Sequence, residues 1–361
     1  MNEKRIFITD CEGPISKNDN AFEITSHFVP QGEKFFKLIS RYDDILAEVL
    51  RRPCYKAGNT LKLILPFLKA YGVTTQKMRE YSAENILLVP SARETLRYVK
   101  SIMPAYIVST SYEPYIYSLC RLIDFPYENA YCTRVDIDKY PLSEEERKIL
   151  VRLAEEITTM PMIEIPENAS SLDDFPEKDR KTIERLDQIF AEISKMQCGQ
   201  IYREVEPVGG SEKARAVKEI AAKNGTKISN VIYFGDSITD VESFRLIREK
   251  KGLAVSFNGN EYAVKEAEIA VLSEHTIPIS ILAEIFNLSG KDGVLEAAKK
   301  WSRETLESFS VNSILLDELR KVKEKYFIKV ELITDENRER LCEESSIFRK
   351  KVRGEKIGEL G

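Results

Sequence analysis

Short apolar runs of strand-forming residues alternate with helix-like segments along much of this chain. Helix-like segments such as Ser91–Ser101 and Ser211–Asn224 lie between the runs. Strands that are joined through helices pair in parallel, because the helix returns the chain to the same edge of the sheet. The pattern therefore predicts an α/β fold with a mainly parallel sheet. The predicted strands are Arg5–Thr9, Ala105–Val108, Ala130–Thr133, Val231–Phe234, Leu253–Phe257 and Ile269–Leu272.

Two long, mostly helical stretches interrupt this alternation, and a third follows it. Residues 16–88 come after the first strand, and residues 134–208 form a second, mostly helical insertion. We expect the sheet core to comprise residues 1–15, 89–133 and 209–288, with 289–361 as a helical C-terminal extension. The basic tail from Phe348 onward (FRKKVRGEK) is expected to be a solvated terminus.

Composition excludes several classes of function. The 361 residues are 43% hydrophobic and 31% charged, which is typical of a globular protein, and the net charge of −5 argues against a nucleic-acid surface. The N-terminus has no apolar stretch of signal-peptide length, and no segment resembles a membrane span, so we expect a cytoplasmic protein. Six cysteines without a CxxC pair and only two histidines argue against a disulfide framework, a zinc site or a Ser-His-Asp triad.

Polar residues follow three of the predicted strands at the point where each strand ends. They are the segments Asp10–Gly13, Ser109–Ser111 and Gly235–Asp240. In a parallel sheet these ends meet at one edge, where ligands bind. Carboxylate oxygens suit Mg²⁺, and a lysine and a hydroxyl suit the oxygens of a phosphoryl group. This edge is therefore a candidate phosphoryl-transfer site, with Lys213 placed early on a helix after a Gly-Gly pair.

Four motifs in this order resemble those of the haloacid dehalogenase superfamily. The first is Asp10–Gly13, the second is Ser109 at a strand end, the third is Lys213, and the fourth is the acid pair Asp236 and Asp240. The matching segments cover a little under half of the chain. The resemblance implies a Rossmann-like parallel-sheet core and a hydrolase, specifically a phosphatase, that depends on Mg²⁺.

The resemblance also implies a role for each of these residues. Asp10 would be the nucleophile that forms an aspartyl phosphate, and Glu12 would be the general acid and base. Ser109, Thr110 and Lys213 would bind phosphate. The Mg²⁺ ligands would be Asp10, the backbone carbonyl of Glu12, and Asp236. Asp240 would either position the metal ligands without binding the metal itself, or orient Lys213.

Glu12 departs from the usual pattern, in which this position is Asp. Glutamate is one methylene longer with similar acidity, so it can reach a leaving-group oxygen after a modest loop adjustment. Enolase-phosphatases and the bifunctional phosphoserine phosphatase/homoserine phosphotransferase group also carry Glu here. The alternative that this leaves open is a slow or inactive enzyme.

The 16–88 insertion looks like the helical cap of the phosphoserine phosphatase-like subgroup, which implies a small phosphorylated metabolite as substrate. Asp19, Arg51 and Arg52 are candidates for contacts with that substrate, although a solvated loop acid and a solvated helix end are the preferred interpretations. Some archaeal chains of this appearance are described as an energy-converting hydrogenase subunit, but no motif for haem, flavin or an iron–sulfur cluster supports that description.

Three functions are weighed. The leading hypothesis is a phosphatase acting on a small metabolite. The second is a phosphotransferase that passes the phosphoryl group to an alcohol acceptor, and the third is a catalytically quiet interaction subunit. A homodimer, or a protein partner bound through the second insertion or the C-terminal helices, remains open.

Overall fold

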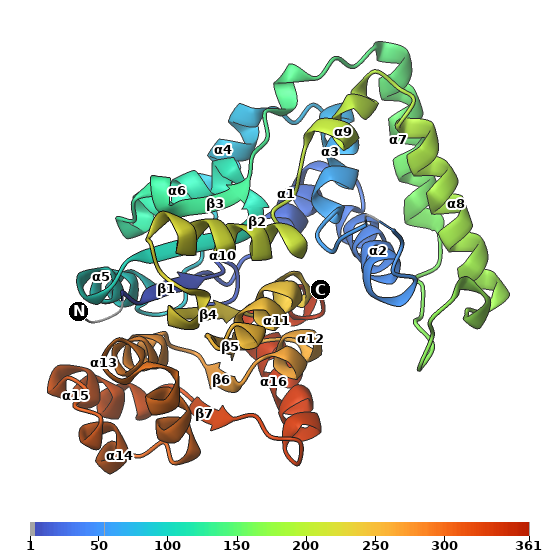
Figure 1. Cartoon of the computed structure of the whole chain (residues 1–361). Helices are drawn as coiled ribbons and strands as arrows, with labels where there is room; N and C mark the ends of the chain where they lie inside the picture. Colours follow the sequence, from blue (N-terminus) through green and yellow to red (C-terminus); the bar gives the residue numbers. More distant parts are fainter. Residues whose placement is uncertain (1–3, 54, 361) are drawn as a thin grey trace.

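A seven-stranded sheet forms the centre of the computed structural model, which describes residues 4–53 and 55–360 (Figure 1). The strand order is β3-β2-β1-β4-β5-β6-β7. All neighbouring pairs are parallel except β6 and β7, so the predicted α/β fold with a mainly parallel sheet is confirmed. The strands are β1 (Ile6–Thr9), β2 (Ala105–Tyr112), β3 (Ala130–Thr133), β4 (Val231–Gly235), β5 (Leu253–Phe257), β6 (Ile269–Ser273) and β7 (Ile328–Leu332).

Strand β1 lies between β2 and β4, and its pairing with both fixes the geometry of the site. Thr9 pairs with Ile107 on one side and with Phe234 on the other. The residues that follow these positions therefore emerge at one edge of the sheet. This register gathers the three polar segments from distant parts of the sequence.

The inner strands of the sheet are buried on both faces, which explains why they are mostly apolar runs. Successive side chains point to opposite faces, so Ile6 and Ile8 pack on one side while Phe7 packs on the other. The helices on the Ile8 face are α10 (Ser211–Lys223), α11 (Val241–Glu249) and α12 (Glu261–Glu266). Those on the Phe7 face are α5 (Ala92–Ile102), α6 (Glu113–Ile123) and α13 (Ile277–Lys299).

The two insertions share one hydrophobic core, which Tyr112 at the end of β2 and Leu360 also join. Tyr42 of the first insertion stacks on Phe190 of the second with ring centroids 5.5 Å apart. Arg52, expected at a solvated helix end, instead donates two hydrogen bonds of 2.6 Å to Asp187. Figure 1 shows these helices together on one side of the molecule. They are α1 (Asn20–Phe28), α2 (Gly32–Asp44) with its π-helical continuation η1 (Ile45–Val49), α3 (Thr60–Ala70), α4 (Thr75–Glu84), α7 (Glu144–Thr159), α8 (Glu177–Ile193) and α9 (Ile201–Glu204).

The C-terminal region is mostly helical, as expected, but it also supplies the edge strand β7, which the sequence did not predict. The expectation that the basic tail is a solvated terminus was wrong, because Arg349 is 3% exposed and Arg353 is 8% exposed. The remaining helices are α14 (Arg303–Ser308), α15 (Ser313–Lys323), α16 (Arg338–Arg353) and α17 (Glu355–Gly358). Short 3₁₀ turns are η2 (Tyr127–Asn129), η3 (Ile137–Lys139), η4 (Leu172–Asp174), η5 (Cys198–Gln200), η6 (Ile228–Asn230) and η7 (Ile238–Asp240).

Within the described part of the chain, no helix combines the length and the apolar character needed to cross a bilayer. The five described cysteines are free thiols, and the sixth, Cys54, lies outside the described residues. Cys11, between the two predicted catalytic acids, is fully buried in the core against the Phe7 face.

Candidate active site

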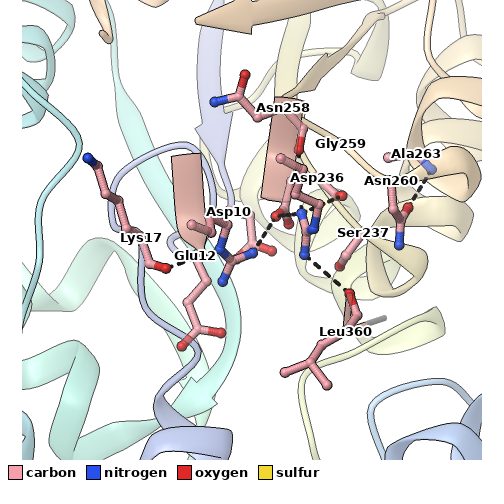
Figure 2. Close-up of polar contacts among 12 residues, drawn as sticks. Asp10, Glu12, Lys17, Asp236, Ser237, Asn258, Gly259, Asn260, Ala263 and Leu360 are labelled. Atoms are coloured by element: carbon pink, nitrogen blue, oxygen red, sulfur yellow. Dashed lines mark hydrogen bonds and ion pairs between the residues drawn. The ribbon is translucent and has the colours of Figure 1, made fainter. Parts of the chain in front are cut away.

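Two carboxylates, Asp10 and Asp236, lie side by side where β1 and β4 end (Figure 2). The backbone N–H of Asp10 donates to the carbonyl of Phe234 at 2.8 Å, which continues the sheet pairing to the edge. Asp10 Oδ1 accepts a hydrogen bond of 2.6 Å from the backbone N–H of Cys11. Asp10 is 4% exposed and Asp236 is 1% exposed. The parallel register thus brings together two acids that are more than two hundred residues apart in the sequence.

Lys213 reaches Asp10 and Asp240 from the first turn of α10. Its ammonium lies 2.5 Å from Asp10 Oδ2 and 2.7 Å from Asp240 Oδ1, and the side chain is fully buried. Burial lowers the pKa of Lys213, but Asp10 and then Asp240 oppose this, and the net pKa is raised. Lys213 is therefore a permanent cation held against the predicted nucleophile.

Two glycines allow α10 to start here. The N-cap residue of the helix is Gly210, at φ +51°, and Ser211 is the first helical residue. A side chain on Gly209 would place its Cβ 2.6 Å from the carbonyl oxygen of Ala57. The backbone of the loop that leads to Lys213 therefore packs directly against the first insertion.

Asp240 uses both of its carboxylate oxygens inside the protein. Oδ1 accepts from Lys213 and from the hydroxyl of Tyr233 at 2.6 Å. Oδ2 accepts from the backbone N–H groups of Asp236 at 2.9 Å and Ser237 at 3.1 Å. Asp240 therefore orients Lys213 and fixes the loop that carries Asp236, which is one of the two arrangements that the resemblance implied.

Glu12 lies beside Asp10 on the loop after β1 and is half-buried (Figure 2). Its Oε1 accepts a hydrogen bond of 2.7 Å from the backbone N–H of Asn20, at the start of the first insertion. Burial raises the pKa of Glu12 well above its usual range, and the neighbouring Asp19 raises it further. A raised pKa means that Glu12 binds its proton more tightly than an ordinary glutamate does, which is the property required of a general acid.

Asp19 is not the exposed loop acid that the sequence suggested. It is half-buried, lines the same cavity as Asp10 and Glu12, and caps α1 by accepting from the backbone N–H of Phe22 at 2.9 Å. The capping bond explains why an acid stands at this position.

The hydroxyl-bearing segment at the end of β2 also reaches the site. Ser109 is buried, and its hydroxyl donates to Ser111 Oγ at 3.2 Å. Thr110 and Ser111 line the cavity. The buried hydroxyl of Thr110 has no hydrogen-bond partner among the described residues, so it is available to an oxygen of a bound group.

Asp10, Glu12, Thr110 and Asp236 are among the residues that line a cavity of about 90 Å³, whereas Lys213, Asp240 and Ser109 lie behind its walls. Its walls come from the ends of β1, β2 and β4, from the first insertion through Phe36 and Asp43, and from the C-terminus through Leu360. Leu360 stands near Glu12 and Asp236 in Figure 2. The cavity is thus enclosed by the sheet edge, the first insertion and the C-terminal end of the chain.

Two arginines of α16, which the sequence reasoning missed, complete the site. Arg349 and Arg353 both donate to Asp236 Oδ2, the latter at 2.8 Å, and both line the cavity. They are four residues apart and so share one face of the helix. The four-residue spacing could have indicated that both arginines lie on one face of a helix. A basic tail, however, does not indicate which acids its arginines contact.

The donor set fits a divalent cation. Carboxylate oxygens of Asp10, Asp236 and Asp240 lie within 4.8 Å of one another, and those of Asp240 are already paired as described above. Asp10 and Asp236 are therefore the carboxylates suited to Mg²⁺, which favours oxygen ligands and one or two carboxylates. At Gly13 a Cβ would lie 2.3 Å from Asp236 Oδ2, so the backbone after Glu12 approaches this carboxylate closely.

Two of the known proteins that are similar to this chain come from Archaeoglobus fulgidus. A phosphoserine phosphatase from Archaeoglobus fulgidus is 29% identical over 102 residues, which is 28% of this chain and 28% of that protein. The solved structure of a gene product from Archaeoglobus fulgidus is similar over 99% of both chains, with 26% identity and a TM-score of 0.79. That similarity includes both insertions and the C-terminal region.

The resemblance inferred from the four motifs is confirmed by a family match. The family of haloacid dehalogenase-like hydrolases matches residues 59–280, which is more than half of the chain. The matched range contains Ser109, Lys213, Asp236 and Asp240, while Asp10 precedes it. This chain belongs to the family of haloacid dehalogenase-like hydrolases.

Proposed function

We propose that this protein is a Mg²⁺-dependent phosphatase that hydrolyses a small phosphorylated metabolite through an aspartyl phosphate on Asp10. The observation that carries the proposal is the buried contact of Lys213 with Asp10 and Asp240. A lysine in this position offsets the charge of the nucleophile and offers N–H donors to the oxygens of a phosphoryl group. The similarity to a phosphoserine phosphatase supports the same activity.

Each residue has a separate role in the proposed reaction. Asp10 attacks phosphorus, and the bond from phosphorus to the leaving oxygen breaks as Glu12 gives that oxygen its proton. Lys213, Ser109 and Thr110 hold the phosphoryl oxygens. Glu12, now ionised, takes a proton from water, and the water oxygen attacks phosphorus to release phosphate and restore Asp10. Mg²⁺, when bound by Asp10, Asp236 and the carbonyl of Glu12, would reduce the repulsion between the carboxylate and the phosphate.

The enclosure of the site supports a small substrate. The cavity holds about 90 Å³, and the first insertion covers it through Phe36 and Leu61. A covered site excludes bulk water, which strengthens electrostatic contacts with a bound phosphate. A phosphorylated metabolite fits this enclosure better than a phosphorylated macromolecule does.

A catalytically quiet interaction subunit is the second candidate. It is favoured by one observation, the binding of Arg349 and Arg353 to the carboxylate of Asp236 that the mechanism assigns to the metal. The same contact is compatible with an enzyme in which the two arginines leave Asp236 before the metal binds. A measurement of phosphatase activity therefore distinguishes the enzyme from the interaction subunit.

The test is phosphate release from a broad panel of phosphorylated metabolites with Mg²⁺. Asp10→Asn removes the nucleophile with little change in shape, and Asp173→Asn is a matched control, because that side chain is 95% exposed on the second insertion. Release by wild type and Asp173→Asn but not by Asp10→Asn would support the phosphatase. Release that survives Asp10→Asn would refute the mechanism, and no release at all from a folded protein would favour the interaction subunit.

A further inference from the structure

Two guanidinium groups converge on a single carboxylate oxygen in the candidate active site. Arg353 Nη1 lies 2.8 Å from Asp236 Oδ2, and Arg349 Nη1 donates to the same oxygen and, at 3.1 Å, to the backbone carbonyl of Asp236. Arg353 also donates to the carbonyls of Lys17, at 3.1 Å, and Asn18. The pair therefore ties the loop after β4 to the loop after β1.

These cations are built into the site and are not surface charges. The side chains of Arg349 and Arg353 are 4% and 3% exposed. The Nε of Arg349 is buried and has no hydrogen-bond partner among the described residues, so its donors are only partly used. A buried cation requires a nearby anion, and Asp236 is the one that both arginines contact.

The same segment also joins the sheet core to the first insertion. Leu341 and Phe348 of α16 pack with Val264 and Leu272 of the core. Beyond α16, Lys356 pairs with Glu33 at 2.6 Å.

The last described residues complete this connection. Glu359 pairs with Lys37 of α2 at 3.1 Å. Leu360 is 7% exposed within the hydrophobic core of the insertions. Residues 338–360, here named the C-terminal arm, therefore contact both sides of the site at once.

Residues of the C-terminal arm line both the small cavity and a larger cleft. Leu360 and Asp44 line both the 90 Å³ cavity and a cleft of about 940 Å³ between α2, α12 and α16. Lys350 and Glu359 line the cleft side. Displacement of the arm would join the two spaces and open a path to Asp10 and Asp236.

We propose that the C-terminal arm competes with the divalent cation for Asp236, so that metal binding releases the arm from the active site. Asp236 Oδ2 cannot bind two arginines and a divalent cation at the same time. The guanidinium groups and the cation are all positive, and like charges this close repel strongly in a buried site. The inference rests on the proposed function only in taking Asp236 as a metal ligand. By thermodynamic linkage, the bound arm lowers the affinity of the site for the metal by the same factor as the bound metal lowers the affinity of the site for the arm.

The first test is the affinity of the full-length protein for Mg²⁺ alone, measured by titration calorimetry. The double variant Arg349→Met/Arg353→Met removes the competing cations and keeps much of their apolar volume. The control Arg340→Met/Lys351→Met removes two positive charges from the same helix, where the side chains are 45% and 61% exposed and contact glutamates elsewhere. We expect the first variant to bind Mg²⁺ at least about tenfold more tightly than wild type, and the control to stay within about twofold. Equal or weaker binding by the first variant would overturn the proposal.

The second test uses wild type and needs no variant to fold. Arg349 and Arg353 are trypsin sites, and both are buried while they contact Asp236. We expect Mg²⁺ to accelerate cleavage after these two residues while leaving cleavage after Lys181, which is 70% exposed, unchanged. In Asp236→Asn the cleavage should not respond to Mg²⁺. Cleavage in wild type that Mg²⁺ leaves unchanged or slows would contradict the proposal.

The failures of the two proposals are distinguishable. Phosphate release that depends on Asp10, combined with an arm insensitive to Mg²⁺, would remove the arm proposal alone. Binding of Mg²⁺ that frees the arm without any phosphate release would support the arm proposal and count against the phosphatase.

Discussion

The ammonium of Lys213 lies 2.5 Å from Oδ2 of Asp10, and the two side chains are 0% and 6% exposed. Removing two charges from water costs free energy that their attraction only partly returns, so a buried ion pair is weak evidence for stability. The pair is better explained by chemistry, since it places a cation where a phosphoryl group would gain charge.

Replacement of Lys213 by methionine should abolish phosphate release. It should also lower the free energy of unfolding by about 3–5 kcal/mol, because the buried carboxyl groups of Asp10 and Asp240 would lose the cation between them. Urea denaturation and a phosphate assay would measure the two effects. Lys218→Met is the control, because Lys218 is exposed on the same helix. Wild-type turnover by the Lys213 variant would contradict the assigned role.

Tyr233→Phe should remove one of the hydrogen bonds that hold Asp240 in place, while the contact between Asp240 and Lys213 remains. The hydroxyl of Tyr233 donates to Asp240 Oδ1 at 2.6 Å, and a hydrogen bond to a charged group contributes about 1.5–3 kcal/mol. We therefore expect a loss of stability of that size and a smaller loss of activity than for Lys213→Met. Tyr131→Phe, at a half-buried tyrosine on β3, is the matched control. If the two Tyr→Phe variants behaved alike, Asp240 would not depend on this contact.

The stability of the metal-free protein should fall as pH rises toward 7. Burial, only partly offset by Lys213 and reinforced by Asp240 and Asp236, raises the pKa of Asp10 from 3.8 to about 7. The folded protein then binds the proton more tightly than the unfolded chain does. The stabilisation is fully present below pH 3.8 and is lost as pH rises through about 7.

The measurement is the urea midpoint across this pH range in EDTA, compared between wild type and Asp10→Asn. The variant cannot titrate at this position, so its midpoint should depend less on pH. Addition of Mg²⁺ at high pH should restore stability in wild type alone, because the cation binds the ionised carboxylate. Parallel curves for the two proteins would show that Asp10 is not the group responsible.

Gly13→Ala should damage the metal site more than an equivalent change elsewhere. Gly13 has φ +95°, and a Cβ there would lie 2.3 Å from Asp236 Oδ2. Gly225 also has a positive φ, of +63°, but its Cβ would meet nothing within 4 Å. Gly225→Ala should therefore cost only the backbone strain of about 1 kcal/mol, whereas Gly13→Ala should cost more and weaken Mg²⁺ binding. Equal effects in denaturation and in Mg²⁺ titration would show that the close approach is unimportant.

Much of the sheet core could be predicted because its signals are local. The run that ends at Thr9 and the run that ends at Phe234 are mostly apolar, and each is followed by an acid within two residues. The parallel pairing then requires Asp10 and Asp236 to meet at one edge. Lys213 was found in the same way, as a cation just after a Gly-Gly pair.

The C-terminal contribution could not be predicted, because its partners are distant in sequence. Arg349 meets Asp236, which is 113 residues away, and nothing near the tail indicates that acid. A basic composition alone favours solvation, so the burial of Arg353 was missed. For the same reason, the pairing of Arg52 with Asp187 across 135 residues was not visible in either insertion.

The central claim, phosphoryl transfer through Asp10, is tested most directly by trapping the intermediate. Wild-type protein would be mixed with Mg²⁺ and its best substrate from the panel, quenched in acid within a single turnover, digested and analysed by mass spectrometry. The account predicts an acid-stable, hydroxylamine-sensitive phosphate on the peptide that contains Asp10, absent from Asp10→Asn. Turnover by wild type with phosphate on another residue, or with no phosphorylated protein at any time point, would contradict it.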